Sequence, residues 1–305
     1  MVLTSAVIWP TQVRAQQSPS KVWRVALFYP GTSGDAEREV IGAFVSELGS
    51  RGYIEGKNLV FDVREAHGRL ERIPAFMNEL IALRPDVIVP IGNPVIAAAQ
   101  HATTTIPIVM WAVVDPVGFG FVSSLSRPGA NSTGTTAMSD LSVSKALELL
   151  HLLVPAAHRV AVLVSSGPGA PLLLGLAKKA AEAMGLTVLP ISAPTQADLD
   201  RAFAEMVAKD CEALFVPLQA AYSGPAIPLL AAKSKLPAVY QLLNLVEDGG
   251  LASYGEDHKQ IARRSAYLVD RIFKGTRPSD LPIEEPVTFI LAVNLAHQRS
   301  GETPH

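Results

Sequence analysis

The sequence has little of the residue types on which disulfide, metal and nucleic-acid chemistry usually depend. Cys211 is the only cysteine in 305 residues, so no intrachain disulfide, thiolate metal cluster or paired-cysteine reaction can form. The 7 histidines include no i, i+4 pair, which leaves the usual zinc-binding pattern of a helix unfilled. The formal net charge of -2 predicts no basic surface for nucleic acid or for an acidic membrane.

Sequence motifs of common enzymes are also missing. Gly31 begins a Gly-Thr-Ser-Gly run, but Asp35 stands where a nucleophile elbow has its second glycine. The segment 52–58 lacks the glycine spacing and the hydroxyl of a phosphate-binding loop. Gly118 and Gly120 are not followed by the third glycine that a dinucleotide fingerprint requires. We therefore predict no catalytic residue, no metal site and no cofactor.

The sequence does contain enough apolar material for a large core. Hydrophobic residues make up 49% of the chain, the mean hydropathy is +0.26, and charged residues make up only 18%. A length of 305 residues corresponds to two ordinary domains or to one large domain. After the first residues, no apolar run reaches the length of a membrane span.

Residues 1–15 are expected to be a secretory signal peptide with a truncated start. A short apolar segment is followed by Val13-Arg14-Ala15, which fits the small-x-Ala rule of signal peptidase. Arg14 is the first positive charge, so the basic region that normally precedes the apolar segment is missing. No cysteine follows the cleavage site, so we expect export to the periplasm without a lipid anchor. The alternative is that residues 1–15 are an irregular N-terminal tail of a cytosolic protein.

One supersecondary unit occurs twice in the chain. Residues 84–111 predict a buried strand, a tight loop at Gly92-Asn93-Pro94, a short helix and a second strand, because β-branched apolar runs bounded by proline flank the loop and the helix. Residues 212–241 repeat this order. The prolines that bound the strands match between the copies: Pro90 with Pro217, and Pro107 with Pro237. The duplication predicts two lobes of equal topology.

The rest of the chain extends this pattern. Strands and helices alternate in each half, which predicts an α/β protein of two similar doubly wound, parallel-sheet lobes joined by a hinge. A stretch rich in Gly, Ser, Thr and Pro between Asp115 and Ser142 is the expected crossing between the lobes. We assign residues 23–134 and 253–281 to the first lobe, and residues 135–252 and 282–305 to the second.

The candidate binding residues lie in the loops at the carboxyl ends of the predicted strands, because open α/β sheets bind ligands at that edge. Gly92 and Asn93 would offer backbone N–H groups to a carboxylate, although Asn93 also suits a simple helix cap. Asp115 could meet an ammonium group or form an Asp-Pro turn. Six further residues could contact a solute or serve as turn and core residues: Thr32, Ser33, Ser165, Ser166, Gln219 and Tyr240.

Several long motifs resemble one family. The runs RVALFYPG, LRPDVIVPIGNP, TTTIPIVMWAVVDPVGFG, LPAVYQLLNLVEDGGLASYG and IEEPVTFILAVNL resemble the ABC-transporter substrate-binding proteins with the type I periplasmic binding fold, a group with tryptophan- and tyrosine-binding members. The resemblance implies two hinged lobes, which close around a small solute and deliver it to an ABC permease in the inner membrane. We expect the protein to be a monomer. It also implies ligand contacts at Gly92, Asn93, Asp115, Ser165, Tyr240 and Tyr254.

The expected function is therefore that of an exported solute-binding component of an ABC importer, with an amino acid or a related carboxylate as the solute. One alternative is a periplasmic ligand-sensing domain of a signalling system, and another is an α/β enzyme. No helix-turn-helix precedes Arg24, which disfavours a DNA-binding regulator. The lone Cys211 excludes a two-cysteine racemase. Asn93 stands where the family more often has a small hydroxylic residue, so a different specificity is expected.

Overall fold

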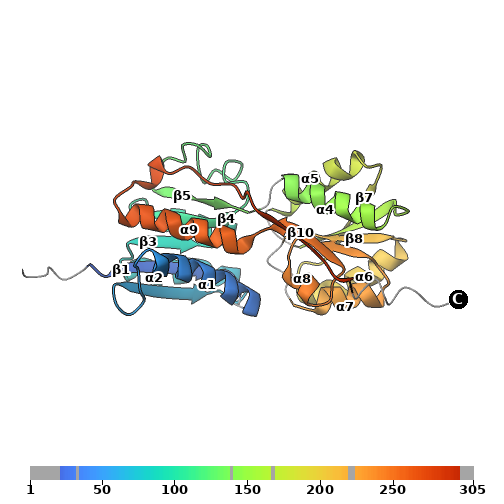
Figure 1. Ribbon diagram of the computed structural model, residues 1–305, viewed down its shortest axis with the longest axis horizontal. Helices are drawn as coiled ribbons and strands as arrows, with labels where there is room; N and C mark the ends of the chain where they lie inside the picture. The colour runs from blue at the N-terminus through green and yellow to red at the C-terminus, as the bar shows by residue number, and fades with distance from the viewer. Residues whose placement is uncertain (1–20, 32–33, 138–139, 166–168, 219–223, 296–305) are drawn as a thin grey trace, which may run out of the picture.

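The structure, a computed structural model, describes residues 21–31, 34–137, 140–165, 169–218 and 224–295. It consists of two α/β lobes side by side, and the chain passes between them more than once (Figure 1). Each lobe is a sheet with helices on both faces. The predicted fold class is confirmed.

The first lobe is built on a 5-stranded parallel sheet in the order β2-β1-β3-β4-β5. Its central strands are apolar and buried on both faces, as a parallel sheet covered by helices requires. Helices α1 and α9 cover one face, and α2 and α3 cover the other. The elements are β1 Trp23–Tyr29, α1 Asp35–Ser50, β2 Leu59–Glu65, the short 3-10 helix Leu70–Arg72, α2 Ile73–Ala82, β3 Val87–Pro90, α3 Asn93–Ala102, β4 Ile108–Val113, β5 Ser132–Thr136 and α9 His258–Phe273.

The second lobe is built on a 6-stranded sheet in the order β11-β10-β9-β8-β6-β7, in which only the pairing of β11 with β10 is antiparallel. Helices α4 and α5 cover one face, and α6, α7 and α8 cover the other. The elements are α4 Asp140–Leu153, β6 Arg159–Val164, α5 Ala170–Glu182, β7 Thr187–Ser192, α6 Leu199–Ala208, β8 Ala213–Val216, α7 Ala226–Lys233, β9 Ala238–Tyr240, α8 Asn244–Glu247, β10 Ala252–Glu256 and β11 Phe289–Val293, with 3-10 helices at Gln196–Asp198 and Pro278–Asp280.

The duplication extends to individual hydrogen bonds. In each lobe an arginine of a central strand (β1 or β6) donates its backbone N–H to an acidic side chain just before the paired strand β3 or β8. The distance is 2.8 Å in the first lobe and 2.9 Å in the second. In each lobe the carbonyl of the proline before the following strand accepts a bond of 2.9 Å. The matching pairs are Arg24–Asp86 with Arg159–Glu212, and Ile88–Pro107 with Leu214–Pro237.

β5 lies within the stretch that the sequence indicated only as an irregular crossing. Its residues, Ser132–Thr136, are all buried beside β4, but none is a bulky apolar residue. Gly134 has a φ of 155°, and a Cβ there would collide with the carbonyl of Met110. The strand therefore forms through close backbone approach, which leaves no apolar pattern in the sequence.

The passages between the lobes lie a few residues from their predicted positions. Residues 253–256, assigned to the first lobe, pair as part of β10 in the sheet of the second lobe. Residues 282–284, assigned to the second lobe, stay with the first, since Ile283 is buried there and the N–H of Glu284 donates to the Gly134 carbonyl (2.9 Å). Strand pairing therefore sets these lobe boundaries a few residues later in the chain than the sequence predicted.

Candidate functional site

The carboxyl ends of both sheets face the junction between the lobes. β5 leads from its carboxyl end into α4 of the second lobe, and β10 leads from its carboxyl end into α9 of the first. The neighbouring strands β3, β4, β8 and β9 run parallel to these two, so they end at the same edges. The described residues that directly follow these strands border the junction, which is where open α/β sheets bind ligands.

In the first lobe, Asn93 joins two of these loops. Gly92, with a φ of 77°, turns the chain into α3. The Asn93 side chain then donates from Nδ2 to the Val114 carbonyl and accepts from the Val114 N–H at Oδ1, both at 2.9 Å. The expectation that Asn93 caps the helix is wrong, because Gly92 holds the cap position and the amide is directed to β4. The start of α3 is thus fixed beside the end of β4.

Asp115 directly follows Val114, the residue that the Asn93 side chain binds. It is exposed and has a φ of 44°, and its Oδ1 accepts from the N–H of Gly118 (2.9 Å). The carboxylate therefore closes a turn, which is the structural alternative that the sequence left open. Through Val114, the structure brings Asp115 together with Gly92 and Asn93 at one end of the sheet.

In the second lobe, the side-chain amide of Gln241 joins strand ends by hydrogen bonds, as that of Asn93 does in the first. It is buried at the end of β9, where Oε1 accepts from the N–H of Leu218 (2.9 Å) and Nε2 donates to Ser142 Oγ (3.1 Å). The sequence placed Gln241 in a strand-end loop but predicted no contact for its side chain, although an amide that directly follows a buried apolar strand is a usable signal. The carbonyl of Gln241 also lies against Gly255, where a Cβ would not fit. Gln241 therefore holds the ends of β8, β9 and β10 together with the start of α4.

Both predicted tyrosines lie within strands, Tyr240 as the last residue of β9 and Tyr254 inside β10. Tyr240 is only 1% exposed and packs in the core beneath α6, α7 and α8, and this burial raises the pKa of its hydroxyl. Tyr254 lies in the middle of β10, where its ring stacks on Phe289 with centroids 5.8 Å apart. Core packing thus accounts for the Tyr240 ring. Ser165 follows β6 at the junction, whereas Thr32, Ser33, Ser166 and Gln219 lie outside the described residues.

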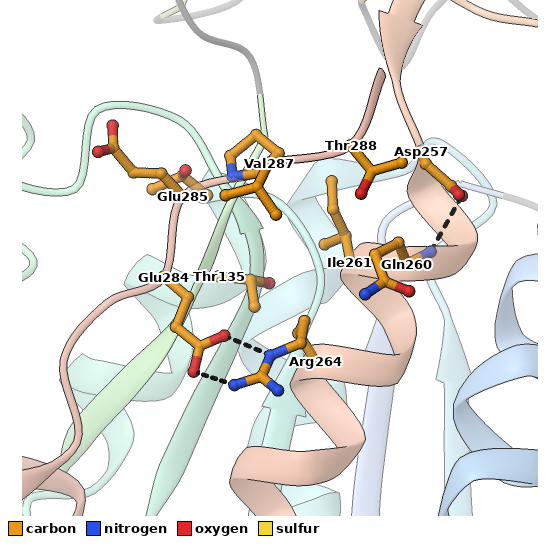
Figure 2. Close-up of a pocket in the computed structure, with 11 residues that line it drawn as sticks. Thr135, Asp257, Gln260, Ile261, Arg264, Glu284, Glu285, Val287 and Thr288 are labelled. Carbon is orange, nitrogen blue, oxygen red and sulfur yellow. Dashed lines mark hydrogen bonds and ion pairs between the residues drawn. The ribbon is translucent and has the colours of Figure 1, made fainter. Parts of the chain in front are cut away.

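A pocket of about 530 Å³ lies at the hinge, between the end of β5, the start of α9 and the segment 284–288. Figure 2 shows Arg264 of α9 reaching across to Glu284, with Nε donating to Oε2 (2.6 Å) and Nη2 to Oε1 (2.7 Å). The backbone of Glu284 pairs with β5, since its N–H donates to Gly134 and its carbonyl accepts from Thr136, both at 2.9 Å. Glu284 thereby fastens one passage between the lobes to β5 and to α9.

The sequence model of the family described as ABC transporter substrate binding protein matches residues 26–301. The chain belongs to this family. Its members bind a substrate for a transporter and are not enzymes, so the resemblance and the prediction of no enzymatic activity are confirmed. Among the described residues, no group of His, Cys, Asp and Glu has the arrangement of a metal site, and no helix has the length and apolarity to cross a membrane.

Similar proteins agree with this assignment. A tyrosine-binding protein from Clostridioides difficile is 28% identical over 243 residues, which is 79% of this chain and 70% of that protein. The crystal structure of a conserved domain protein from Vibrio cholerae is 29% identical, with a TM-score of 0.85 over 93% of this chain and 96% of that chain. A structure from Streptococcus pneumoniae in complex with L-Trp, 23% identical, has the same fold, with a TM-score of 0.85 over 92% of this chain and 94% of that chain.

Proposed function

We propose that this substrate-binding protein binds an aromatic amino acid, tyrosine or tryptophan, between its lobes and delivers it to an ABC permease. The observation that carries the proposal is the strand-end cluster of Gly92, Asn93 and Asp115. It combines the amino end of a helix with a carboxylate on a neighbouring loop. A free amino acid presents the complementary pair of charges. The tyrosine-binding and tryptophan-bound relatives support the aromatic side chain.

The two charged ends of the solute fit different parts of this cluster. The first N–H groups of α3 have no partner within the helix, and together with the helix dipole they favour a carboxylate. The carboxylate of Asp115 would receive the ammonium group, and its turn with Gly118 holds it in place. A solute that lacks either group would lose one of these interactions.

Closure of the two lobes would complete the site. Leu218 follows β8 and Gln241 follows β9 at the same junction, and the hydrogen bond between them holds the two strand ends together. The several passages between the lobes favour a hinge that bends in a defined direction over a flexible linker. We propose that closure excludes water from the solute and that the closed form docks on the permease, outside the cytoplasm.

Thermal unfolding of the chain from Gln16 onward tests the proposal. A solute at a hundred times its dissociation constant adds about 2.7 kcal/mol to the free energy of unfolding, which corresponds to a rise of several degrees in Tm. We expect this rise with L-tyrosine or L-tryptophan, and a smaller one with tyramine or with the desamino acids. A rise with neutral sugars, and none with any amino acid, would overturn the proposed solute class.

A further inference from the structure

β11 forms an outer edge of the second lobe that no other described strand covers. It is the last strand of the 6-stranded sheet and pairs on one side only, with β10. The carbonyl of Thr288 accepts from the N–H of Asp257 (2.9 Å), and the N–H of Asn294 donates to the carbonyl of Leu251 (2.8 Å). Since backbone groups alternate in direction along a strand, the odd-numbered residues from 289 to 293 direct their N–H and C=O groups outward.

The same odd-numbered residues carry exposed apolar side chains. Val287 is 85% exposed, Leu291 58%, Val293 39% and Leu295 69%, and Phe289 of the same stripe is half-buried under Tyr254. No charged residue occurs from Pro286 to Leu295. Edge strands of monomeric proteins are usually protected by a charged side chain, a bulge or a proline within the strand. β11 has none of these, so it has the character of a strand that another strand covers.

We propose that β11 pairs with β11 of a second copy of this chain, antiparallel and about a two-fold axis at Leu291. This register places Leu291 opposite the partner subunit's Leu291, and Phe289 opposite the partner subunit's Val293. Within β11 every opposed side chain is apolar, and the absence of charge from Pro286 to Leu295 means that two identical edges meet without repulsion. Closed two-fold symmetry is also the commonest arrangement of identical subunits.

The pairing joins the sheets of two second lobes and leaves the proposed solute site accessible. Leu218 and Gln241 lie at the ends of the inner strands β8 and β9, whereas β11 pairs along the side of the sheet. The contact area of one strand edge is at the small end of specific interfaces, so the dimer forms in a concentration-dependent way. This differs from the monomer expected from the sequence.

Analytical ultracentrifugation of the full chain over a range of concentrations tests the proposal. The wild-type protein should pass from monomer to dimer as the concentration rises. Leu291→Lys should stay monomeric, because two lysines would lie directly opposite each other. Leu229→Lys, on α7 of the opposite face and 63% exposed in the wild type, is the matched control and should still dimerise. A monomeric wild-type protein at every concentration overturns the proposal.

Two further variants test the register. Leu291→Glu alone should also be monomeric, but its mixture with Leu291→Lys should form a heterodimer because opposite charges then meet at the axis. In a Cys211→Ala background, Leu291→Cys should form an intersubunit disulfide on oxidation, since opposed Cα atoms lie about 5.5 Å apart in such a pair. Leu229→Cys should not. A dimer that survives Leu291→Lys, or that gives no disulfide at 291, would place the interface elsewhere and overturn the proposal.

Discussion

Two side-chain amides, Asn93 and Gln241, fix the loops at which the lobes meet. Each amide uses its oxygen and its nitrogen at once, so neither loop can shift without breaking two hydrogen bonds. The proposed binding surface is therefore preorganised by residues whose own side chains are engaged within the protein. Such preorganisation lowers the entropic cost of ordering the site when the solute binds.

The variant Asn93→Asp keeps one of the two hydrogen bonds between Asn93 and Val114 and removes the other. The aspartate can still accept from the Val114 N–H, but its second oxygen meets the Val114 carbonyl in place of a donor. We expect the free energy of unfolding to fall by about 1–3 kcal/mol, the usual cost of an unsatisfied polar group. The added charge should also weaken the binding of a carboxylate. Thermal unfolding and calorimetric titration measure the two effects, with the exposed Asn78→Asp of α2 as the control.

Asp115→Asn tests the proposed ammonium contact without disturbing the turn, because the asparagine oxygen can still accept from Gly118. A charged hydrogen bond contributes about 1.5–3 kcal/mol, so affinity for the amino acid should fall roughly tenfold or more. Affinity for the desamino analogue of the same solute should change little. Equal losses for both solutes, or no loss for either, would contradict the ammonium role of Asp115.

Among the elements, the segment 284–288 is a passage between the lobes with contacts on two sides. Glu284 alone connects it to β5 through its backbone and to α9 through its side chain (Figure 2). The segment continues directly into β11 of the second lobe. Its fastening to the first lobe therefore sets where this passage begins to bend.

Glu284→Gln should loosen this passage while leaving both lobes folded. A partly exposed ion pair contributes at most about 1 kcal/mol, so the Tm should fall only slightly. Solute affinity should fall about fivefold or less, since the freed segment must be ordered again on closure. Glu79→Gln, which breaks the Arg64–Glu79 pair inside the first lobe, is the matched control and should leave affinity unchanged. Equal affinities of the two variants would contradict the hinge role.

At the scale of the whole molecule, the core of the first lobe is completed by helix α9, which lies far from the strands of that lobe in the sequence. Helix α9 closes its core against α1, and the buried Asp270 of α9 receives hydrogen bonds from Tyr53 (3.0 Å), Lys274 (2.9 Å) and Arg51 (3.3 Å). Burial by itself would raise the pKa of Asp270, but the hydrogen bonds from Lys274 and Tyr53 and the charges of Lys274 and Arg51 outweigh it and lower the pKa. The ionised carboxylate thus stabilises the contact between distant parts of the sequence.

This shift predicts a loss of stability in acid. Because the pKa of Asp270 is lower in the folded chain than its ordinary 3.8, its contribution is complete well above that pH. It declines as the pH falls below 3.8 and through the lower folded value. Asp270→Asn should cost about 2 kcal/mol at neutral pH and reduce the dependence of Tm on acid pH. Parallel Tm-against-pH curves for the two proteins would contradict this role of Asp270.

The sequence by itself determined the repeated α/β units, the two lobes and the family, because buried parallel strands leave continuous β-branched runs and their bounding prolines are local features. Only the tertiary structure decided which residues those units bring together. β5 forms by backbone approach at Gly134, Tyr240 enters the core, and Gln241 joins distant segments through contacts with Leu218 and Ser142. The outer position of β11 likewise depends on the strand order of the sheet. Pairing between distant segments sets that order, and no local sequence pattern encodes it.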